Sequence, residues 1–343
     1  MTAQLELLGS GTHSPSGAQA WSTLDQRARG ASFVALPVRS VLNTPAATGM
    51  NFWSLNPYVG CEFGCAYCYA RDTHRYAVER AGRTGAGLPP WLDFERRILV
   101  KTEAPAVLAR TLRPARLGEH SLVIGTATDP YQPAERRFRL TRRLLETLLG
   151  FSGLSIGLIT KSPLVTRDLD LLSQLAERHD VSVNISLATL DAALARRLEP
   201  RTPVPRARIR ALRRLAEAGL HAGLLVAPIL PCLTDGQAAL SALFAAAKDA
   251  GAGYVVGMAL RLGPAARRRF LPFLAQEFPD LAPRYERHYA RRNNAGWSYQ
   301  QALSARLAAL QRKHGFPVGE STRRRRQLES ARPAGSPLQT VLL

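Results

Sequence analysis

Residues 60–71 read Gly-Cys-Glu-Phe-Gly-Cys-Ala-Tyr-Cys-Tyr-Ala-Arg, and they place Cys61, Cys65 and Cys68 in one short loop. The spacing Cys-x3-Cys-x2-Cys offers three thiolates, whereas four-ligand zinc or iron–sulfur sites need a further ligand that the loop does not contain. Gly60 and Gly64 allow tight turns that aim backbone amides at metal-bound sulfurs. The loop therefore predicts a metal centre with one open coordination position.

The composition favours one soluble catalytic domain. A chain of 343 residues with 46% hydrophobic residues can bury a large core. Only four cysteines occur and three are clustered, which is unlike a disulfide framework and indicates a reducing, cytoplasmic compartment. Residues 1–24 show no signal peptide or membrane anchor, and the apolar run at 220–233 is too short to span a bilayer.

The net charge of +20 is compatible with a polyanionic partner such as nucleic acid. However, 42 of the 46 basic residues are arginine, a bias that a GC-rich genome also produces. Residues 284–343 hold 12 basic residues against three glutamates, and this concentration is harder to attribute to genome bias. Charge alone therefore leaves nucleic-acid binding open.

Short apolar runs alternate with longer helical patterns, which predicts repeated βα units and a parallel sheet. The expected strands are Ser54–Val59, Ser121–Gly125, Ser155–Ile159, Val181–Leu187, Ala222–Ala227 and Tyr254–Met258. The expected helices are Glu135–Leu149, Leu164–Arg178, Arg206–Ala218 and Gln237–Ala250. A further strand at Ile98–Lys101 and a helix at Ala104–Thr111 form an insertion.

This pattern predicts an incomplete (β/α)6 TIM-like barrel whose active site lies at the carboxyl ends of the strands. We expect the barrel to occupy residues 45–262, after an N-terminal extension, 1–44, whose first thirty residues are disordered or loosely attached. Residues 263–343 form a helical, basic extension with a flexible tail.

The cysteine loop, with Tyr67 before the third cysteine and the first predicted strand before the loop, resembles the signature of the radical S-adenosylmethionine (radical SAM) superfamily. The resemblance implies that Cys61, Cys65 and Cys68 bind three irons of a 4Fe-4S cluster, and that S-adenosylmethionine chelates the fourth. It also implies reductive cleavage of S-adenosylmethionine to a 5′-deoxyadenosyl radical, with electrons from a reductase, flavodoxin or ferredoxin.

Two other interpretations of the loop remain. Cys65 and Cys68 could form half of a structural zinc site, to which His74 could add one ligand, in a zinc or nucleic-acid-binding module. An iron–sulfur electron carrier would be redox active without binding S-adenosylmethionine, and a redox dithiol would leave Cys61 unused. None of these needs six strand ends around a pocket.

Residues 56–61, Asn-Pro-Tyr-Val-Gly-Cys, and 126–133, Thr-Ala-Thr-Asp-Pro-Tyr-Gln-Pro, resemble the spore-photolyase-like branch of the superfamily. The branch implies a nucleic-acid lesion as one substrate class. Spore photolyase uses an additional cysteine in the loop after the second barrel strand, and residues 126–132 here contain none. The remaining cysteine, Cys232, is interpreted as a small residue in a tight turn rather than a radical quencher.

Residues at later strand ends are candidates for binding S-adenosylmethionine, by resemblance. Thr126 and Asp129 end the second strand, where the superfamily contacts the amino group, and Lys161 and Ser186 end the third and fourth. Tyr67 completes the set of cofactor candidates. Each has a structural alternative: Thr126 or Ser186 could satisfy buried backbone, and Asp129 before a proline could initiate a turn. Arg201 is a candidate substrate anchor or a surface arginine.

The C-terminal segment interleaves basic and aromatic residues at 287–292 and 297–299, a mixture that suits single-stranded nucleic acid. The alternative is an amphipathic helix that covers the barrel with Tyr289 and Leu303 inward. The last five residues, 339–343, weakly resemble peptides that dock in the bacterial sliding clamp.

Overall fold

A computed structural model describes residues 23–26, 30–74 and 90–318. The predicted sliding-clamp peptide at 339–343 and most of the segment predicted to be disordered lie outside the described residues. Residues 23–26 of that segment instead form a strand, β1 (Thr23–Gln26), which pairs antiparallel with β2 (Ser32–Ala35).

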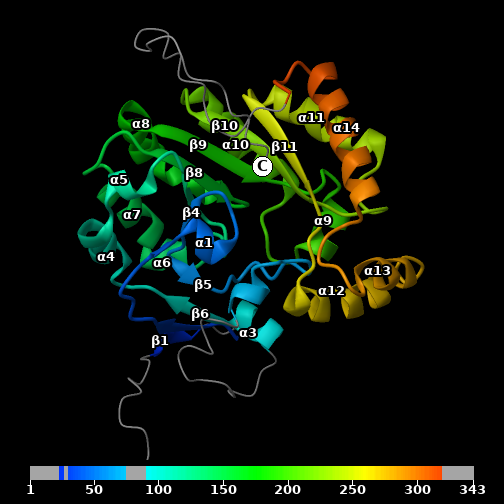
Figure 1. Cartoon of the computed structure of the whole chain (residues 1–343), viewed down its shortest axis with the longest axis horizontal. Coiled ribbons are helices and arrows are strands. Elements are labelled where there is room, and N and C mark those ends of the chain that lie inside the picture. The colour runs from blue at the N-terminus through cyan, green and yellow to red at the C-terminus, as the bar shows by residue number, and fades with distance from the viewer. Residues whose placement is uncertain (1–22, 27–29, 75–89, 319–343) are drawn as a thin grey trace, which may run out of the picture.

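The main sheet contains six parallel strands and an antiparallel edge strand, in the order β11-β10-β9-β8-β7-β4-β3 (Figure 1). The apolar runs that predicted these strands are buried on the sheet. Their bounds are β3 (Leu42–Asn43), β4 (Trp53–Leu55), β7 (Leu122–Ile124), β8 (Ser155–Thr160), β9 (Asp180–Ser186), β10 (His221–Ile229) and β11 (Tyr254–Ala259). The predicted parallel αβ fold is confirmed.

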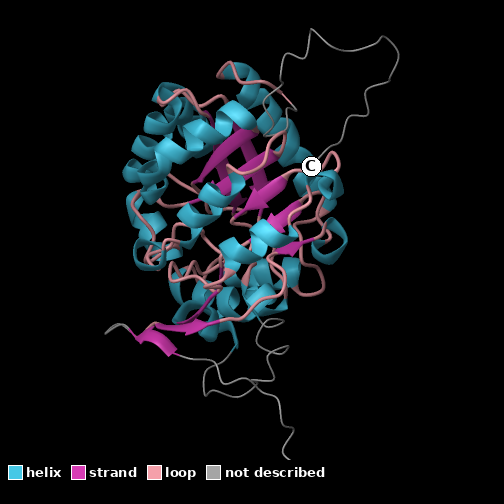
Figure 2. Cartoon of the chain, turned by 90° about the vertical axis from the view of Figure 1, so that its left-hand side faces the viewer, coloured by secondary structure: helices cyan, strands magenta, loops and turns pink. Residues whose placement is uncertain are grey.

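Helices surround the central strands, whereas one pair of strands projects at the lower edge of the molecule (Figure 2). The predicted helix at 135–149 is interrupted because Arg139 adopts a left-handed conformation with φ 50°. A 3-10 turn, η1 (Pro163–Asp168), replaces the first residues of another predicted helix. The helices along this part are α4 (Ala104–Thr111), α6 (Glu135–Phe138), α7 (Leu140–Leu148), α8 (Leu169–Arg178), α10 (Pro205–Glu217) and α11 (Gln237–Asp249).

The predicted first strand, Ser54–Val59, is wrong as one element, because it forms two strands in different sheets. β4 belongs to the main sheet, whereas β5 (Tyr58–Val59) ends a second sheet of order β1-β2-β6-β5, with β6 spanning Arg97–Val100. Pro57 between the two strands has no N–H to donate to a ladder. The Asn56 side chain turns to accept from the Ala127 amide at 2.9 Å. The break leads the chain into the cysteine loop.

The C-terminal segment forms α12 (Pro264–Glu277), α13 (Ala282–Tyr289) and α14 (Trp297–Lys313). Tyr289 and Leu303 are buried, as the packing alternative predicts. Helix α14 lies along the edge strand β11, where the Gln311 side chain donates to the Val255 carbonyl at 2.9 Å. Shorter helices are α1 (Pro45–Thr48), α3 (Pro90–Arg96), α5 (Pro114–Leu117) and α9 (Ala192–Leu198). No helix in the described part is long and apolar enough to cross a membrane.

Candidate active site

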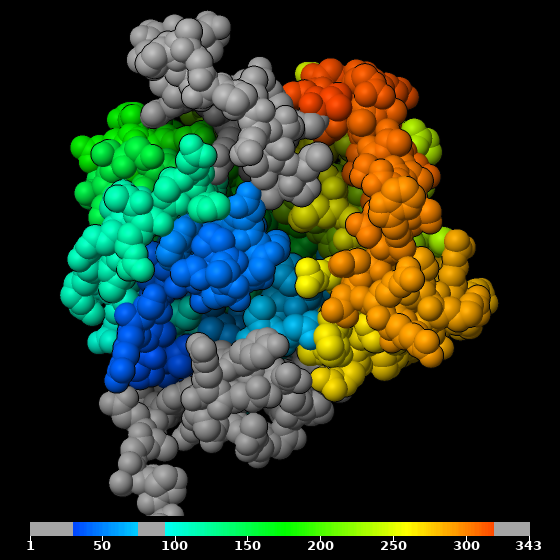
Figure 3. Space-filling view, viewed as in Figure 1, coloured from blue at the N-terminus to red at the C-terminus, as the bar shows by residue number. Residues whose placement is uncertain are grey.

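The cysteine loop follows β5 and is held between α3 and α9. The amide of Cys61 donates to the Phe94 carbonyl and the amide of Ala66 to the Leu198 carbonyl, both at 2.9 Å. Gly60 and Gly64 have φ of 89° and 62°, so the tight turns predicted at these glycines are present. In the space-filling view, the sky-blue atoms of this part of the chain lie between the blue N-terminal and the yellow C-terminal segments (Figure 3).

The three cysteines have the properties that metal ligands need, because they are free thiols in a largely buried loop. All are free thiols, Cys61 and Cys65 are buried, and Cys68 is half-buried. Burial raises the pKa of each thiol, so these groups are neutral until a metal cation favours the thiolate form. Within the described residues, no group of three or more His, Cys, Asp or Glu is placed to hold a single metal ion. A cubane cluster takes one thiolate per iron and so holds its cysteines further apart than one ion would.

Residues 126–133 support the start of the cysteine loop. The Thr128 hydroxyl donates to the Gly60 carbonyl at 2.6 Å, and the Gln132 side-chain amide donates to the same oxygen at 3.1 Å. The Gln132 side-chain oxygen accepts from the Glu62 amide at 2.9 Å. Thr128 and Gln132 therefore fix the backbone around Cys61, a role that the sequence did not assign to them.

Thr126 and Asp129 make local hydrogen bonds, as expected if their roles are structural. The Thr126 hydroxyl lies 2.6 Å from the Ser54 hydroxyl. The two carboxylate oxygens of Asp129 accept from the Tyr131 amide at 2.9 Å and the Lys161 amide at 2.7 Å, the first of which closes an Asx turn. Burial raises the pKa of Asp129. Both residues tie the second strand end to its neighbours.

Lys161, Ser186 and Tyr67 come together, as the strand-end argument predicts. The Lys161 ammonium donates to the Ser186 hydroxyl at 3.0 Å and to the Tyr67 hydroxyl oxygen at 3.3 Å. Ser186 in turn donates to the Ala227 carbonyl at 3.1 Å. Three of the five predicted cofactor residues thus form one hydrogen-bonded group beside the third cysteine.

Glu199 joins this group, and sequence reasoning missed it. Its carboxylate accepts from Lys161 at 2.9 Å, from Arg208 and from the Tyr67 hydroxyl. Burial alone would raise the pKa of Glu199, but Lys161 and Arg208 outweigh burial and lower it. Arg208 also donates to backbone carbonyls, including that of Ser186 at 3.1 Å. One carboxylate therefore lies between two cations in a nearly water-free position.

Glu95 is the second buried carboxylate that the sequence did not reveal. The fully buried Arg71 donates to Glu95 at 2.6 Å and to the Cys65 carbonyl at 2.9 Å. Arg201 also pairs with Glu95 and donates to the Glu62 carbonyl, so this candidate substrate anchor holds the cysteine loop. Both glutamates occur in arginine-rich segments, and this sequence pattern is a signal for buried ion pairs.

Cys232 and His74 have local structural roles. Cys232 is exposed in the turn after β10, with φ 63°, and its amide donates to Asp235 at 2.8 Å, as the turn interpretation predicts. His74 is buried edge-on against Phe94, with Nε2 3.4 Å from the Arg97 carbonyl oxygen. Burial lowers the pKa of His74 to about 4.

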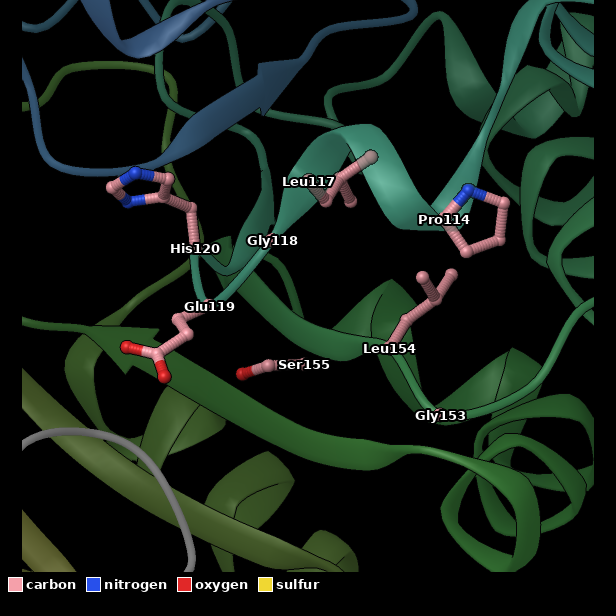
Figure 4. Close-up of a pocket in the computed structure, with 8 residues that line it drawn as sticks. All are labelled: Pro114, Leu117, Gly118, Glu119, His120, Gly153, Leu154 and Ser155. Atoms are coloured by element: carbon pink, nitrogen blue, oxygen red, sulfur yellow. The ribbon is translucent and has the colours of Figure 1, made fainter. Parts of the chain in front are cut away.

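A surface pocket opens at the other ends of the strands. Its lining, drawn in Figure 4, consists of Pro114, Leu117, Gly118, Glu119, His120, Gly153, Leu154 and Ser155. These residues precede or begin β7 and β8, whereas the cysteine loop and Lys161 follow strand ends. The pocket is therefore separate from the predicted chemistry.

The family model "Radical SAM superfamily" matches residues 55–244. This chain belongs to the radical SAM superfamily. Uncharacterised proteins of Mycobacterium tuberculosis are 36% identical over 287 residues, which cover 83% of this chain and 82% of theirs. An uncharacterised protein of Methanocaldococcus jannaschii is 30% identical over 53% of this chain and 61% of its own length.

Solved structures of spore photoproduct lyase share the fold. A complex with dinucleoside spore photoproduct has a TM-score of 0.59 and 16% sequence identity, and covers 82% of this chain and 79% of the other. A variant with bound AdoMet and the same dinucleoside has a TM-score of 0.58. The chain is therefore a radical SAM enzyme with the TIM-like barrel type of fold.

Proposed function

We propose that this radical SAM enzyme cleaves S-adenosylmethionine reductively at a 4Fe-4S cluster, and that the resulting 5′-deoxyadenosyl radical acts on a base or lesion in nucleic acid. The observation that carries the first part is the loop of three free thiols, two buried and one half-buried, which lies within the residues matched by the family. Cys61, Cys65 and Cys68 would bind the cluster, and burial would keep water away from it.

Lys161 and Ser186 are the residues that we assign to the cofactor's carboxylate. The Lys161 side chain is 15% exposed, and its ion pair with Glu199 at 2.9 Å offsets the cost of burying the ammonium. Ser186 accepts from Lys161 and fixes the direction of the ammonium. We assign the cofactor's amino group to the end of the second strand, near Thr126 and Asp129, and keep Tyr67 in the site because its hydroxyl donates to Glu199.

The proposed substrate class rests on the C-terminal segment. Arg291 and Arg292 are exposed, and the Trp297 ring is 75% exposed, so cations and an open aromatic face occur together on this surface. The folds of structures solved with dinucleoside spore photoproduct support the same class. The buried Tyr289 and Leu303 are explained by packing, so the proposal rests on the exposed residues of this segment.

Anaerobic reconstitution tests the first part of the proposal. We expect about four irons and four sulfides per chain, and 5′-deoxyadenosine after addition of dithionite and S-adenosylmethionine. Cys65→Ala should abolish both the full cluster and the product, whereas Cys232→Ala, which removes an exposed cysteine outside the loop, should retain both. Bound zinc with no cleavage after reconstitution would contradict the proposal.

Salt-dependent binding tests the substrate class. We expect single-stranded DNA or RNA to bind less tightly as salt increases, and Arg291→Ala with Arg292→Ala to reduce the slope of log affinity against log salt by about 1.4, at about 0.7 per phosphate contact. Trp297→Ala should weaken binding by about 1–3 kcal/mol with little change of slope. Binding that none of these substitutions changes would limit the segment to packing. Deuterium exchange between substrate and 5′-deoxyadenosine identifies the substrate itself.

A further inference from the structure

Arginines of α9, of α12 and of the segment after α9 pair with glutamates of α3 and α12 near the cysteine loop. The ribbons of α3 and α12 lie next to each other (Figure 1). Arg201 and Arg269 both pair with Glu95 of α3, and Arg269 belongs to α12. Arg197 of α9 pairs at 2.8 Å with Glu277 at the end of α12. We call Arg197, Arg201 and Arg269 the arginine face.

The arginine face lies directly against the cysteine loop. Arg201 is 48% exposed at its side chain, yet its guanidinium lies so close to the loop that a Cβ added to Gly64 would be 1.9 Å from Nη2. Gly64 is the residue before Cys65. The Arg201 and Glu95 side chains therefore both lie against the backbone between the first two thiols.

The charge of this region is positive after its ion pairs are counted. Among the ion pairs of the described residues, the arginine face and the buried Arg71, four cations in all, share Glu95 and Glu277. Two neighbouring carboxylates, Asp93 and Asp72, bind Arg97 and the Ala265 amide instead. The arginines reach solvent, with side-chain exposures of 43%, 48% and 26%, while Glu95 is 5% exposed. A positive surface of this kind attracts a negatively charged partner and speeds encounter.

We propose that the arginine face is the docking surface for an acidic one-electron carrier protein of the flavodoxin or ferredoxin class. The inference rests on the proposed function, which needs an electron at the cysteine loop. One electron passes from the reduced flavin or iron–sulfur centre of the carrier to the oxidised cluster, and no bond or proton is transferred. Electron-transfer encounters use small, weak interfaces, which suits a few half-exposed arginines.

The cofactor residues assigned above are more buried than the arginine face. Tyr67 and Lys161 meet beside Glu199, at the strand ends where radical SAM enzymes bind S-adenosylmethionine. The side chains of Lys161 and Glu199 are 15% and 2% exposed, whereas that of Arg201 is 48% exposed. A carrier that approaches over Arg201 would leave the buried strand ends to cofactor and substrate.

Nucleic acid fits the arginine face less well than an acidic protein. Single-stranded nucleic acid needs open aromatic rings for its bases. The aromatic rings here are already covered, because Arg197 lies 4.0 Å above Phe278 and Arg269 lies 5.9 Å from the centre of Phe273. The open tryptophan, Trp297, belongs to α14 instead.

The test compares two reductants of the reconstituted full chain. Flavodoxin with NADPH and flavodoxin reductase needs a docking surface, whereas dithionite does not. The double variant Arg197→Gln with Arg269→Gln removes two charges without removing a contact to the cysteine loop. The control, Arg110→Gln with Arg116→Gln, removes two exposed charges, one in α4 and one in α5.

We expect the flavodoxin-driven rate of 5′-deoxyadenosine formation to fall about tenfold in the arginine-face variant at low salt, with the dithionite-driven rate unchanged. The control variant should keep both rates. A full flavodoxin-driven rate in the arginine-face variant would overturn the proposal, as would an equal loss of both rates. Loss of single-stranded DNA binding with an unchanged flavodoxin-driven rate would overturn it in favour of nucleic acid.

Binding separates this inference from the proposed function. If the wild-type chain forms no 5′-deoxyadenosine even with dithionite, the proposed function fails. Salt-sensitive binding of flavodoxin, measured by calorimetry and weakened in the arginine-face variant alone, would still support the docking surface. Equal binding by all three chains would overturn it.

Discussion

Replacing Glu199 by glutamine tests the buried charge group beside the cysteine loop. Glu199 is the carboxylate shared by Lys161 and Arg208, whose side chains are 15% and 0% exposed. Glutamine keeps the shape and one acceptor oxygen but leaves two buried cations without a counter-charge. Breaking a buried pair in this way costs about 3–5 kcal/mol, and we expect the lower end, about 3 kcal/mol, because glutamine retains hydrogen bonds.

Urea unfolding of the metal-free, reduced chain at pH 7 measures this loss. Glu277→Gln is the matched control, because Glu277 also pairs with an arginine at 2.8 Å but is 31% exposed. A pair of that exposure contributes less than about 1 kcal/mol. A loss for Glu199→Gln no greater than for Glu277→Gln would refute the electrostatic argument.

The pH dependence provides an independent check. The folded pKa of Glu199 lies below its ordinary value of 4.5, so its stabilising contribution is present above pH 4.5 and is lost as the pH falls further. The difference in unfolding free energy between wild type and Glu199→Gln should therefore be constant near neutral pH and shrink in acid. A difference that grows in acid would have the wrong sign.

Three further substitutions test other features. Gly64→Ala should lower the amount of iron bound after reconstitution, because its φ is +62° and the added Cβ would meet Arg201. Gly118→Ala should bind as much iron as wild type, because its φ is similar, +57°, but the space around it is open. Equal iron in both variants would contradict the close approach of Arg201 to Gly64. Leu310→Ala should destabilise the chain by about 2–5 kcal/mol, because Leu310 is 1% exposed in α14, and the exposed Ser304→Ala should have little effect in the same thermal unfolding experiment. Burial lowers the pKa of His74 from 6.5 to about 4. The wild type should therefore lose stability as the pH falls from 6.5 to 4, by about 3 kcal/mol at 1.36 kcal/mol per pKa unit. A His74→Phe variant with the same pH dependence in urea unfolding would exclude this cause.

The sequence predicted the parallel strands well because each is a short apolar run between turn residues. Tyr254–Ala259 and Asp180–Ser186 lie within one or two residues of the predicted bounds. The first strand failed because residues 54–59 read as one extended segment, while Pro57 and the Asn56 side chain divide it between two sheets. Such a division depends on partners about 40 and 70 residues further along the chain, Val100 and Ile124.

Residues of the candidate site could be predicted where their type or spacing is unusual in the sequence. Residues whose role depends on ion-pair partners from distant parts of the chain could not. Cys61, Cys65 and Cys68 are recognisable by spacing alone, and Lys161 by its rarity in an arginine-rich chain. Glu95 and Glu199 carry no such spacing, because each is defined by arginines and a lysine that reach it from other elements. Charged residues in an arginine-rich sequence look like solvated surface until the fold buries them.

The contacts around the cysteine loop also determine when during synthesis the loop can take its shape. Its Ala66 amide bonds to the Leu198 carbonyl, and its Glu62 carbonyl accepts from Arg201, so the loop waits for residues more than 130 positions downstream. Long-range contacts of this kind form late. We expect a ribosome-bound nascent chain to leave its three thiols accessible to alkylating reagents until α9 has emerged. Iron–sulfur delivery would then wait until more than half of the 343 residues have been made.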